Sequence, residues 1–184
     1  MEDGAVKKKT LRLAISGAAF VIVTGTLLHF VYEWSGNNSF VGVFSPINES
    51  VWEHLKLAFV PILFFAFIEY YFLRKDVHNF WFGKAVECLL VMGIIVTFFY
   101  TYSGIIGRSI VVVDILSFFA AVIIGKVTSY RLLLKGTEKR RSAVVPAFVL
   151  LLIAASFIVF TFYPPHIPLF EDSQTSTYGI YQTK

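Results

Sequence analysis

Five long apolar stretches constrain this chain more than any other feature of its sequence. They cover Leu11–Trp34, Leu55–Leu73, Phe82–Ile106, Ile110–Tyr130 and Ala143–Tyr163. A helix needs about 20 mostly apolar residues to cross the roughly 30 Å hydrocarbon core of a bilayer. The sequence therefore predicts an all-α fold, a transmembrane helical bundle of five spans that forms a single integral membrane domain over residues 1–184.

The composition argues against the soluble classes of protein. Hydrophobic residues make up 57% of the 184 residues and charged residues only 15%, whereas a soluble domain has about 25% charged residues. A soluble enzyme, a disordered chain and a nucleic-acid-binding domain are therefore poor interpretations. Cys88 is the only cysteine, which excludes an intrachain disulfide and a cysteine-based metal motif.

Basic residues alternate between the two sides of the predicted bundle. Thirteen Lys and Arg residues lie before the first stretch or around the second and fourth loops, against three at the other ends. The positive-inside rule then places the N-terminus in the cytoplasm and the tail, residues 164–184, outside. The short basic stretch Leu132–Arg141 is interpreted as a topology signal, and we expect no nucleic-acid partner.

His29 and Glu33 lie four residues apart in the first stretch and so share a helical face. Ala18, Gly25 and Thr26 lie on the same face, and small residues let helices approach closely in lipid. We expect the pair to point into the bundle near its outer end. It is either part of a metal site or a local His–Glu hydrogen bond.

Asp114 is the acidic residue of the fourth stretch, on a face of small and polar residues. Ionisable groups inside a span are costly and therefore suggest a role. The carboxylate is either a ligand, proton relay or base, or a structural partner of Arg108 or of a neighbouring helix.

The segment 45–56 before the second stretch is unusually polar. The Ser-Pro pair at its start predicts a helix beginning there, which would place Glu49, Glu53 and Lys56 on one face. Two carboxylates beside His54 suggest a metal site or acid–base chemistry. The alternative is an amphipathic helix with a Glu53–Lys56 ion pair.

Pro61 lies within the second stretch and has no N–H. We therefore expect a kink there and a free carbonyl at Leu57.

Two further carboxylates lie toward the cytoplasmic side. Glu69 is expected to pair with Arg74 and Glu87 with Lys84, as side chains that reach toward the membrane surface. The alternative is a transport half-pathway through both carboxylates.

Three of the four histidines are predicted on the outer side, together with several carboxylates. Three histidines with a nearby carboxylate base are enough for a catalytic zinc site. The candidate metal ligands are His29, Glu33, His54 and His166, and the catalytic candidates are Glu49, Glu53 and Asp114. Zinc or another divalent metal is the expected cofactor.

The tail begins Tyr163-Pro-Pro-His166, and the two prolines force an extended exit from the fifth span. It is either a mobile end or a segment that folds back over the outer mouth through Ile167, Leu169 and Phe170.

The chain resembles a family of small, uncharacterised multi-pass membrane proteins from Gram-positive bacteria. The likeness rests on Asn48-Glu-Ser-Val-Trp-Glu-His-Leu-Lys56 and on Tyr163-Pro-Pro-His-Ile-Pro-Leu-Phe-Glu-Asp172, with Thr177-Tyr-Gly-Ile180 after it. It extends from the end of the first span to the tail. The resemblance implies a bacterial plasma membrane and no particular chemistry.

The chain is also similar to the small substrate-binding subunits of bacterial vitamin-uptake transporters. Ala14-Ile-Ser-Gly-Ala18 matches the Ala-x-x-x-Ala face through which those subunits contact a partner, although such a motif is also ordinary helix packing. Those subunits usually have six spans with both ends inside, and a predicted outer tail argues against the match.

The preferred hypothesis is an outward-facing pocket that binds a metal and hydrolyses a lipid or another membrane-delivered substrate. One alternative is a solute-binding or transport subunit that docks a membrane partner through the Ala14/Ala18 face. Another is a structural or accessory subunit without a site. All three interpretations place the chain in a lipid bilayer, as a multi-pass protein of a bacterial plasma membrane.

Overall fold

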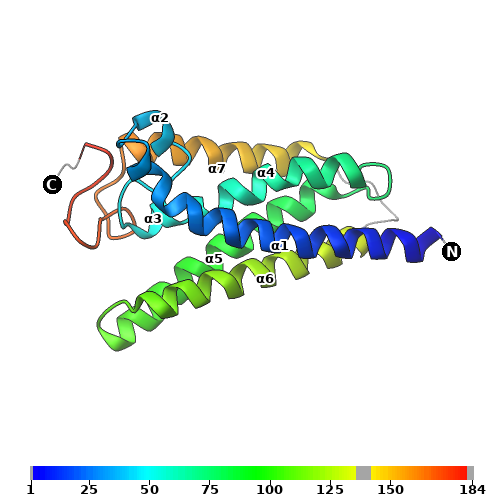
Figure 1. Cartoon of the computed structure of the whole chain (residues 1–184), viewed down its shortest axis with the longest axis horizontal. Coiled ribbons are helices and arrows are strands. Elements are labelled where there is room, and N and C mark those ends of the chain that lie inside the picture. The colour runs from blue at the N-terminus through cyan, green and yellow to red at the C-terminus, as the bar shows by residue number, and fades with distance from the viewer. Residues whose placement is uncertain (1, 136–141, 182–184) are drawn as a thin grey trace.

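The chain folds into a bundle of helices. The computed structural model describes residues 2–135 and 142–181, and within these ranges the only β-structure is an isolated bridge between Glu171 and Tyr178. The helices are α1 (Glu2–Trp34), α2 (Ser39–Gly42), α3 (Val51–His54), α4 (Lys56–Leu73), α5 (Phe80–Ile106), α6 (Val111–Lys135) and α7 (Val144–Phe162). The five long helices run roughly along one direction (Figure 1). The predicted all-α fold is confirmed.

Five segments are long and apolar enough to cross a membrane. They are Gly4–Trp34, Val51–Leu73, Phe80–Ile106, Val111–Lys135 and Val144–Phe162, and each corresponds to one predicted stretch. α3 and α4 together form the second of them, because Leu55 between them has helical torsion angles of φ −63° and ψ −24°. The prediction of five membrane-length apolar helices is therefore confirmed. The basic residues Lys139, Arg140, Arg141 and Lys184 lie outside the described part of the chain.

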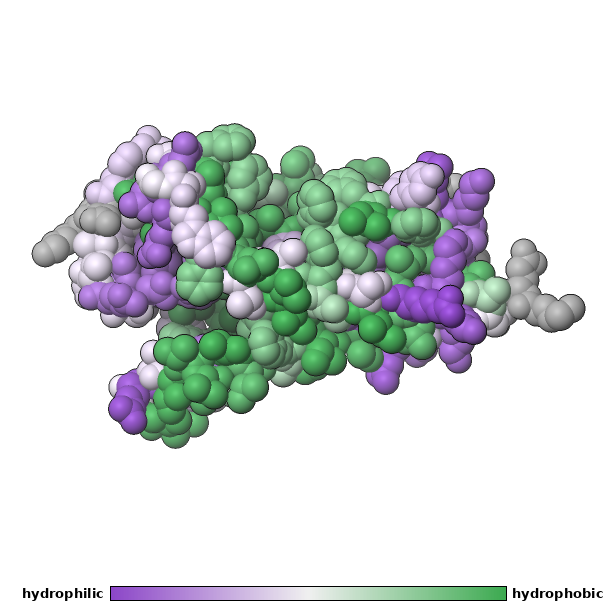
Figure 2. Space-filling model, viewed as in Figure 1, coloured by the Kyte–Doolittle hydropathy of each residue, from purple (hydrophilic) through white to green (hydrophobic). Residues whose placement is uncertain are grey.

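The two ends of the bundle are polar and its middle is apolar. A broad apolar belt separates two hydrophilic ends (Figure 2), and large side chains such as Phe64, Val111 and Leu151 are exposed on the belt. Such a surface suits contact with lipid. The basic end carries the N-terminus and the α4–α5 loop, and the cap end carries α2, α3 and tail residues 164–181 (Figure 1).

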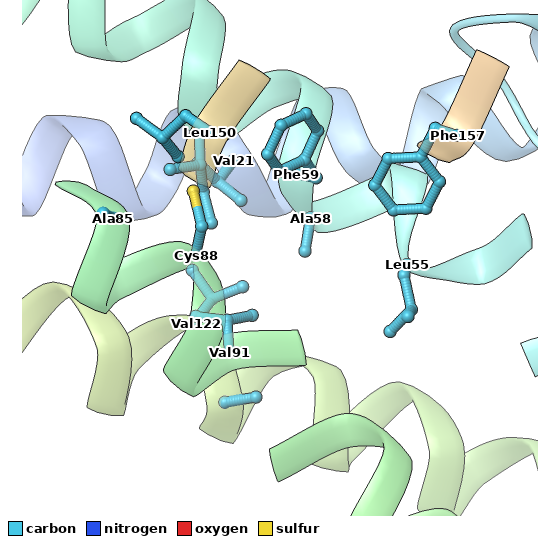
Figure 3. Close-up of a cluster of buried hydrophobic side chains, with 12 residues drawn as sticks. Val21, Leu55, Ala58, Phe59, Ala85, Cys88, Val91, Val122, Leu150 and Phe157 are labelled. Atoms are coloured by element: carbon cyan, nitrogen blue, oxygen red, sulfur yellow. The ribbon is translucent and has the colours of Figure 1, made fainter. Parts of the chain in front are cut away.

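A buried apolar core joins all five long helices. Val21 of α1, Phe59 of α4, Val91 of α5, Val122 of α6 and Phe157 of α7 belong to it (Figure 3). Ala18 packs against this core as well. Part of the predicted Ala14/Ala18 docking face is thus already used within the chain.

The helix that leads into the second span begins later than the expected start at Ser45. Residues 45–50 form bends, and α3 begins after them. The Glu53 N–H donates to the Ser50 Oγ at 3.3 Å, which is the spacing of a capping box. The Ser45 hydroxyl instead donates to the Val41 carbonyl at 3.0 Å. The predicted helix start at Ser45 is therefore wrong, because Ser50 supplies the cap.

α1 packs closely against α4 near Pro61. Pro61 lies inside α4 and has no N–H to pair with the Leu57 carbonyl. A Cβ at Gly25 of α1 would lie 2.5 Å from the Leu57 carbonyl oxygen. The missing side chain of Gly25 thus permits this contact, and α1 covers the carbonyl that the proline leaves without its helical partner.

The tail folds back over the cap end. The Ile180 N–H donates to the Thr161 carbonyl, and the Trp52 N–H donates to the Leu169 carbonyl, both at 3.0 Å. The Trp52 ring packs against the buried Phe170 with ring centroids 4.9 Å apart. Of the two alternatives that the sequence left open for the tail, the structure shows the folded-back one.

Four charged side chains form a buried network toward the basic end. Lys84 Nζ lies 2.5 Å from Glu69 and 2.7 Å from Glu87. Lys126 Nζ lies 3.4 Å from Glu69 and 3.0 Å from Glu87. The predicted Lys84–Glu87 pair is confirmed. Glu69 binds Lys84 and Lys126 instead of the predicted Arg74, and no member of this charged network is more than 4% exposed, so these side chains do not reach the surface.

Candidate metal centre

His29 supplies the first imidazole of a cluster at the cap end. It lies in the penultimate turn of α1, one turn beyond Gly25, so the close contact of α1 with α4 helps to fix its position. Its side chain is 34% exposed. His29 Nε2 lies 3.3 Å from His54 Nε2, although two loops and the short helix α2 separate α1 from α3 in the chain.

His54 is oriented by the backbone of its own helix. Its Nδ1 lies 2.8 Å from the Ser50 carbonyl oxygen, and a carbonyl can only accept, so Nδ1 carries the proton in that contact. A histidine whose one ring nitrogen donates in this way presents the other nitrogen as a lone pair. The cap of α3 therefore also aims His54 Nε2 at the cluster.

Glu49 reaches the two histidines from the loop before α3. Its carboxylate lies 3.4 Å from His54 Nε2 and 3.7 Å from His29 Nε2. The Ser173 hydroxyl of the tail donates to the Glu49 carbonyl at 3.3 Å. The sequence suggested that Glu49 and Glu53 share a helical face. They do not, because the helix starts only after Ser50.

The cluster has the dimensions of a metal site. One ligand atom each from His29, Glu49 and His54 lies within 4.8 Å of the other two. Ligand atoms about 2.0–2.1 Å from a tetrahedral zinc ion are separated by about 3.3 Å. The two Nε2 atoms are 3.3 Å apart, which matches that value, and the Glu49 carboxylate lies 3.4 Å from His54 Nε2 through Oε2 and 3.7 Å from His29 Nε2 through Oε1. Two imidazoles and one carboxylate fit zinc and several other divalent metals.

The charges in the cluster favour an ionised Glu49. The hydrogen bond with His54 lowers the pKa of the Glu49 carboxyl from its ordinary value, and the nearby imidazoles act in the same direction against partial burial. The side chain of Glu49 is 36% exposed and that of His54 is 30% exposed. Water and a small substrate group can therefore reach all three ligands.

Glu53 occupies a different environment from Glu49. Its carboxylate is buried and lies 2.6 Å from Lys56 Nζ, and it accepts from the Ile47 N–H at 3.1 Å. Lys56 also donates to the Thr161 hydroxyl at 2.6 Å. The predicted Glu53–Lys56 pair is confirmed, but it fastens the cap loop and α7 to α4, and the geometry gives Glu53 no access to the metal centre.

Three other predicted site residues lie outside the cluster. The Asp114 carboxylate accepts from the Tyr102 hydroxyl, which is the helix–helix hydrogen bond that the sequence analysis considered. The His166 ring stacks on Tyr178 with centroids 4.4 Å apart. Glu33 lies exposed on α1, one turn beyond His29.

Two contributors to these contacts were missed from the sequence. Tyr102 is an aromatic residue of an apolar stretch, and only its approach to Asp114 in the fold shows its hydrogen-bonding role. The Ser50 carbonyl could not be assigned to His54 while the helix was expected to begin at Ser45. The Ser50-x-x-Glu53 spacing was the signal that would have placed the helix start correctly.

The comparisons with known proteins identify a family without an assigned activity. No curated protein and no solved structure matches the chain. A family model described as "Family of unknown function (DUF6512)" matches residues 3–180, which is nearly the whole chain. With its five membrane-length apolar helices and its His/Glu/His cluster, the chain belongs to family DUF6512.

Proposed function

We propose that this chain is a membrane-embedded, metal-dependent hydrolase whose metal, zinc in the first instance, is held by His29, Glu49 and His54. One observation carries the proposal: ligand atoms from α1, a loop and α3 lie within 4.8 Å of one another, and the two imidazole Nε2 atoms are 3.3 Å apart, as two ligands of a tetrahedral zinc ion would be. A close contact at Gly25, the helix cap at Ser50 and a hydrogen bond from the tail hold the three residues in place. Side chains that meet by chance would not need these contacts.

The ligand number favours catalysis over a purely structural metal. Structural zinc sites are closed by four protein ligands, whereas catalytic sites have three and leave one position for water or substrate. Zinc in an open site acts as a Lewis acid and activates water at neutral pH. About one third of each of the three side chains is exposed to solvent, which agrees with an open site.

The remaining carboxylates have separate roles in this proposal. Glu49 is a ligand, and Glu53 is neutralised by Lys56. Glu33 lies one helical turn from His29 on the same face of α1. Glu33 is therefore the carboxylate that we assign to proton transfer, in place of Glu49 or Glu53.

The substrate class follows from where the cluster lies. It is at the cap end of the apolar belt, where α1 ends and the second span begins. We propose that the basic end faces the cytoplasm of a bacterium, so that the cap end faces outward from the plasma membrane. Lipids, and substrates delivered along the membrane, reach such a site directly.

The test is hydrolysis by the purified, reconstituted protein. Vesicles of phosphatidylglycerol and phosphatidylethanolamine are incubated with protein carrying zinc, and released products are separated by mass spectrometry. We expect turnover that stops on addition of a chelator and returns with zinc, and that falls at least about 100-fold in Glu33→Gln. Turnover that persists with chelator would contradict the proposal, and so would its absence from every membrane lipid and ester tested with zinc bound.

A further inference from the structure

A cavity lies at the basic end, away from the metal centre. Its volume is about 590 Å³. It opens between the C-terminal end of α4, the loop after it, the first residues of α5, and the two residues before α7. The proposed hydrolase does not use this cavity.

One side of the cavity is aromatic. Tyr70, Phe80 and Trp81 line it, and their rings contact one another with centroids 5.3–5.4 Å apart. Tyr and Trp prefer the boundary between lipid and water. This side of the cavity therefore suits the glycerol and first acyl carbons of a lipid.

The rest of the lining includes polar residues and a positive charge. Arg74, His78, Asn79 and Ser142 belong to it, and among the lining residues that the structure describes there is no carboxylate. Asp76 of the same loop is bound to Lys9 of α1, with Nζ and carboxylate 2.8 Å apart. The positive charge of Arg74 is therefore not neutralised by that aspartate.

The start of α5 adds to this positive character. Asn79, which precedes α5, and Phe80, Trp81 and Phe82 of its first turn line the cavity. The N–H groups of a first turn carry partial positive charge and favour an anion. Arg74 and this helix end thus act on the same space.

We propose that this cavity binds the headgroup of an anionic phospholipid, with its phosphate on Arg74 and its glycerol and acyl chains along Tyr70, Phe80 and Trp81. A guanidinium binds a phosphate with two parallel hydrogen bonds. A free phosphate ion would use only the polar lining residues. A zwitterionic lipid would bring a cationic group to a site whose described lining residues include no carboxylate to receive it.

The experiment uses the purified full-length protein in detergent. Phosphatidylglycerol, phosphatidylcholine and soluble glycerol 3-phosphate are added separately, and retained lipid is measured by native mass spectrometry together with Tm. We expect phosphatidylglycerol to be retained and to raise Tm, and the other two to have little effect. Arg74→Gln is expected to lower retention of phosphatidylglycerol about tenfold, and Arg74→Lys by less.

Lys75→Gln is the matched control, because it removes the same charge from the next residue, which does not line the cavity. It is expected to retain lipid as the wild type does. Equal losses in Lys75→Gln and Arg74→Gln would show a general charge effect and overturn the proposal. Equal stabilisation by glycerol 3-phosphate would show a site for a free anion, and equal retention of phosphatidylcholine would refute the anionic preference.

Discussion

His29 Nε2 on α1 and His54 Nε2 on α3 lie 3.3 Å apart, with the Glu49 carboxylate beside both. Two imidazoles that face each other through unprotonated nitrogens gain little unless a proton or a metal lies between them. His54 donates through Nδ1 to the Ser50 carbonyl. In metal-free protein a protonated Nε2 can donate to the Glu49 carboxylate, and loss of that proton leaves Nε2 with the lone pair that a metal ligand needs.

Glu49→Gln should change the pH dependence of stability in metal-free protein. The pKa of Glu49 is lowered from 4.5 by its hydrogen bond with His54. Because the folded pKa lies below the unfolded one, ionised Glu49 stabilises the fold above about pH 4.5, and this contribution is lost as pH falls through the lower folded value. We expect the wild type to have the higher Tm at pH 5 to 6, and the two proteins to converge in stronger acid.

Differential scanning fluorimetry in the presence of a chelator, from about pH 3 to pH 7, measures this difference. Glu171→Gln serves as a control, because it removes one carboxylate from the cap end outside the cluster. If the difference in Tm between the wild type and Glu49→Gln widens as the pH falls toward 3, the assignment of an ionised Glu49 is contradicted.

Gly25→Ala should destabilise the protein and weaken metal binding together. The new Cβ would lie 2.5 Å from the Leu57 oxygen and 2.9 Å from the Phe118 ring, so α1 has to move. Overpacking of this kind costs about 1–3 kcal/mol. Since His29 lies one turn further along α1, we also expect a several-fold rise in the Kd for zinc.

Gly93→Ala is the matched control for this substitution. Gly93 lies inside α5, and nothing lies within 4 Å of a Cβ placed there. Alanine has the higher helix propensity by about 1 kcal/mol, so the control should be neutral or slightly stabilising. Equal behaviour of the two variants in thermal unfolding would disprove the close α1–α4 contact.

The charged network should show strong coupling between its members. Glu87→Gln leaves Lys84 and Lys126 with one carboxylate, Glu69, between them. Removing one partner of a buried pair costs about 3–5 kcal/mol. Lys126→Met alone is also expected to destabilise, since it leaves two carboxylates with one lysine.

The double variant Glu87→Gln/Lys126→Met keeps Lys84 and Glu69 as a neutral pair 2.5 Å apart. Its loss of stability should therefore be smaller than the sum of the two single losses. Thermal unfolding in detergent measures all three. Strict additivity would mean that the network does not act as a unit.

The spans were predictable because they depend on local composition. About 20 apolar residues in succession specify a membrane-length helix wherever the helix packs. The Lys84–Glu87 and Glu53–Lys56 pairs were predictable for the same reason, since helical spacing brings each pair together.

Contacts between distant segments were not predictable in this way. Glu49 and Glu53 lie four residues apart in the sequence, and His54 follows them. The Glu49 carboxylate is partly exposed beside His29, whereas the Glu53 carboxylate is buried against Lys56. His166 belongs by sequence to the same set of histidines, but the folded tail stacks it on Tyr178. The different positions of Glu49, Glu53 and His166 depend on the path that the backbone takes after α2 and after α7.

Zinc content tests the central claim most directly. The protein is purified, equilibrated with zinc, freed of excess metal and analysed by inductively coupled plasma mass spectrometry. We expect about one zinc ion per chain in the wild type and in His166→Ala, and a loss of at least about 90% in His54→Ala. Zinc-free wild-type protein, or equal losses in His166→Ala and His54→Ala, would contradict the account.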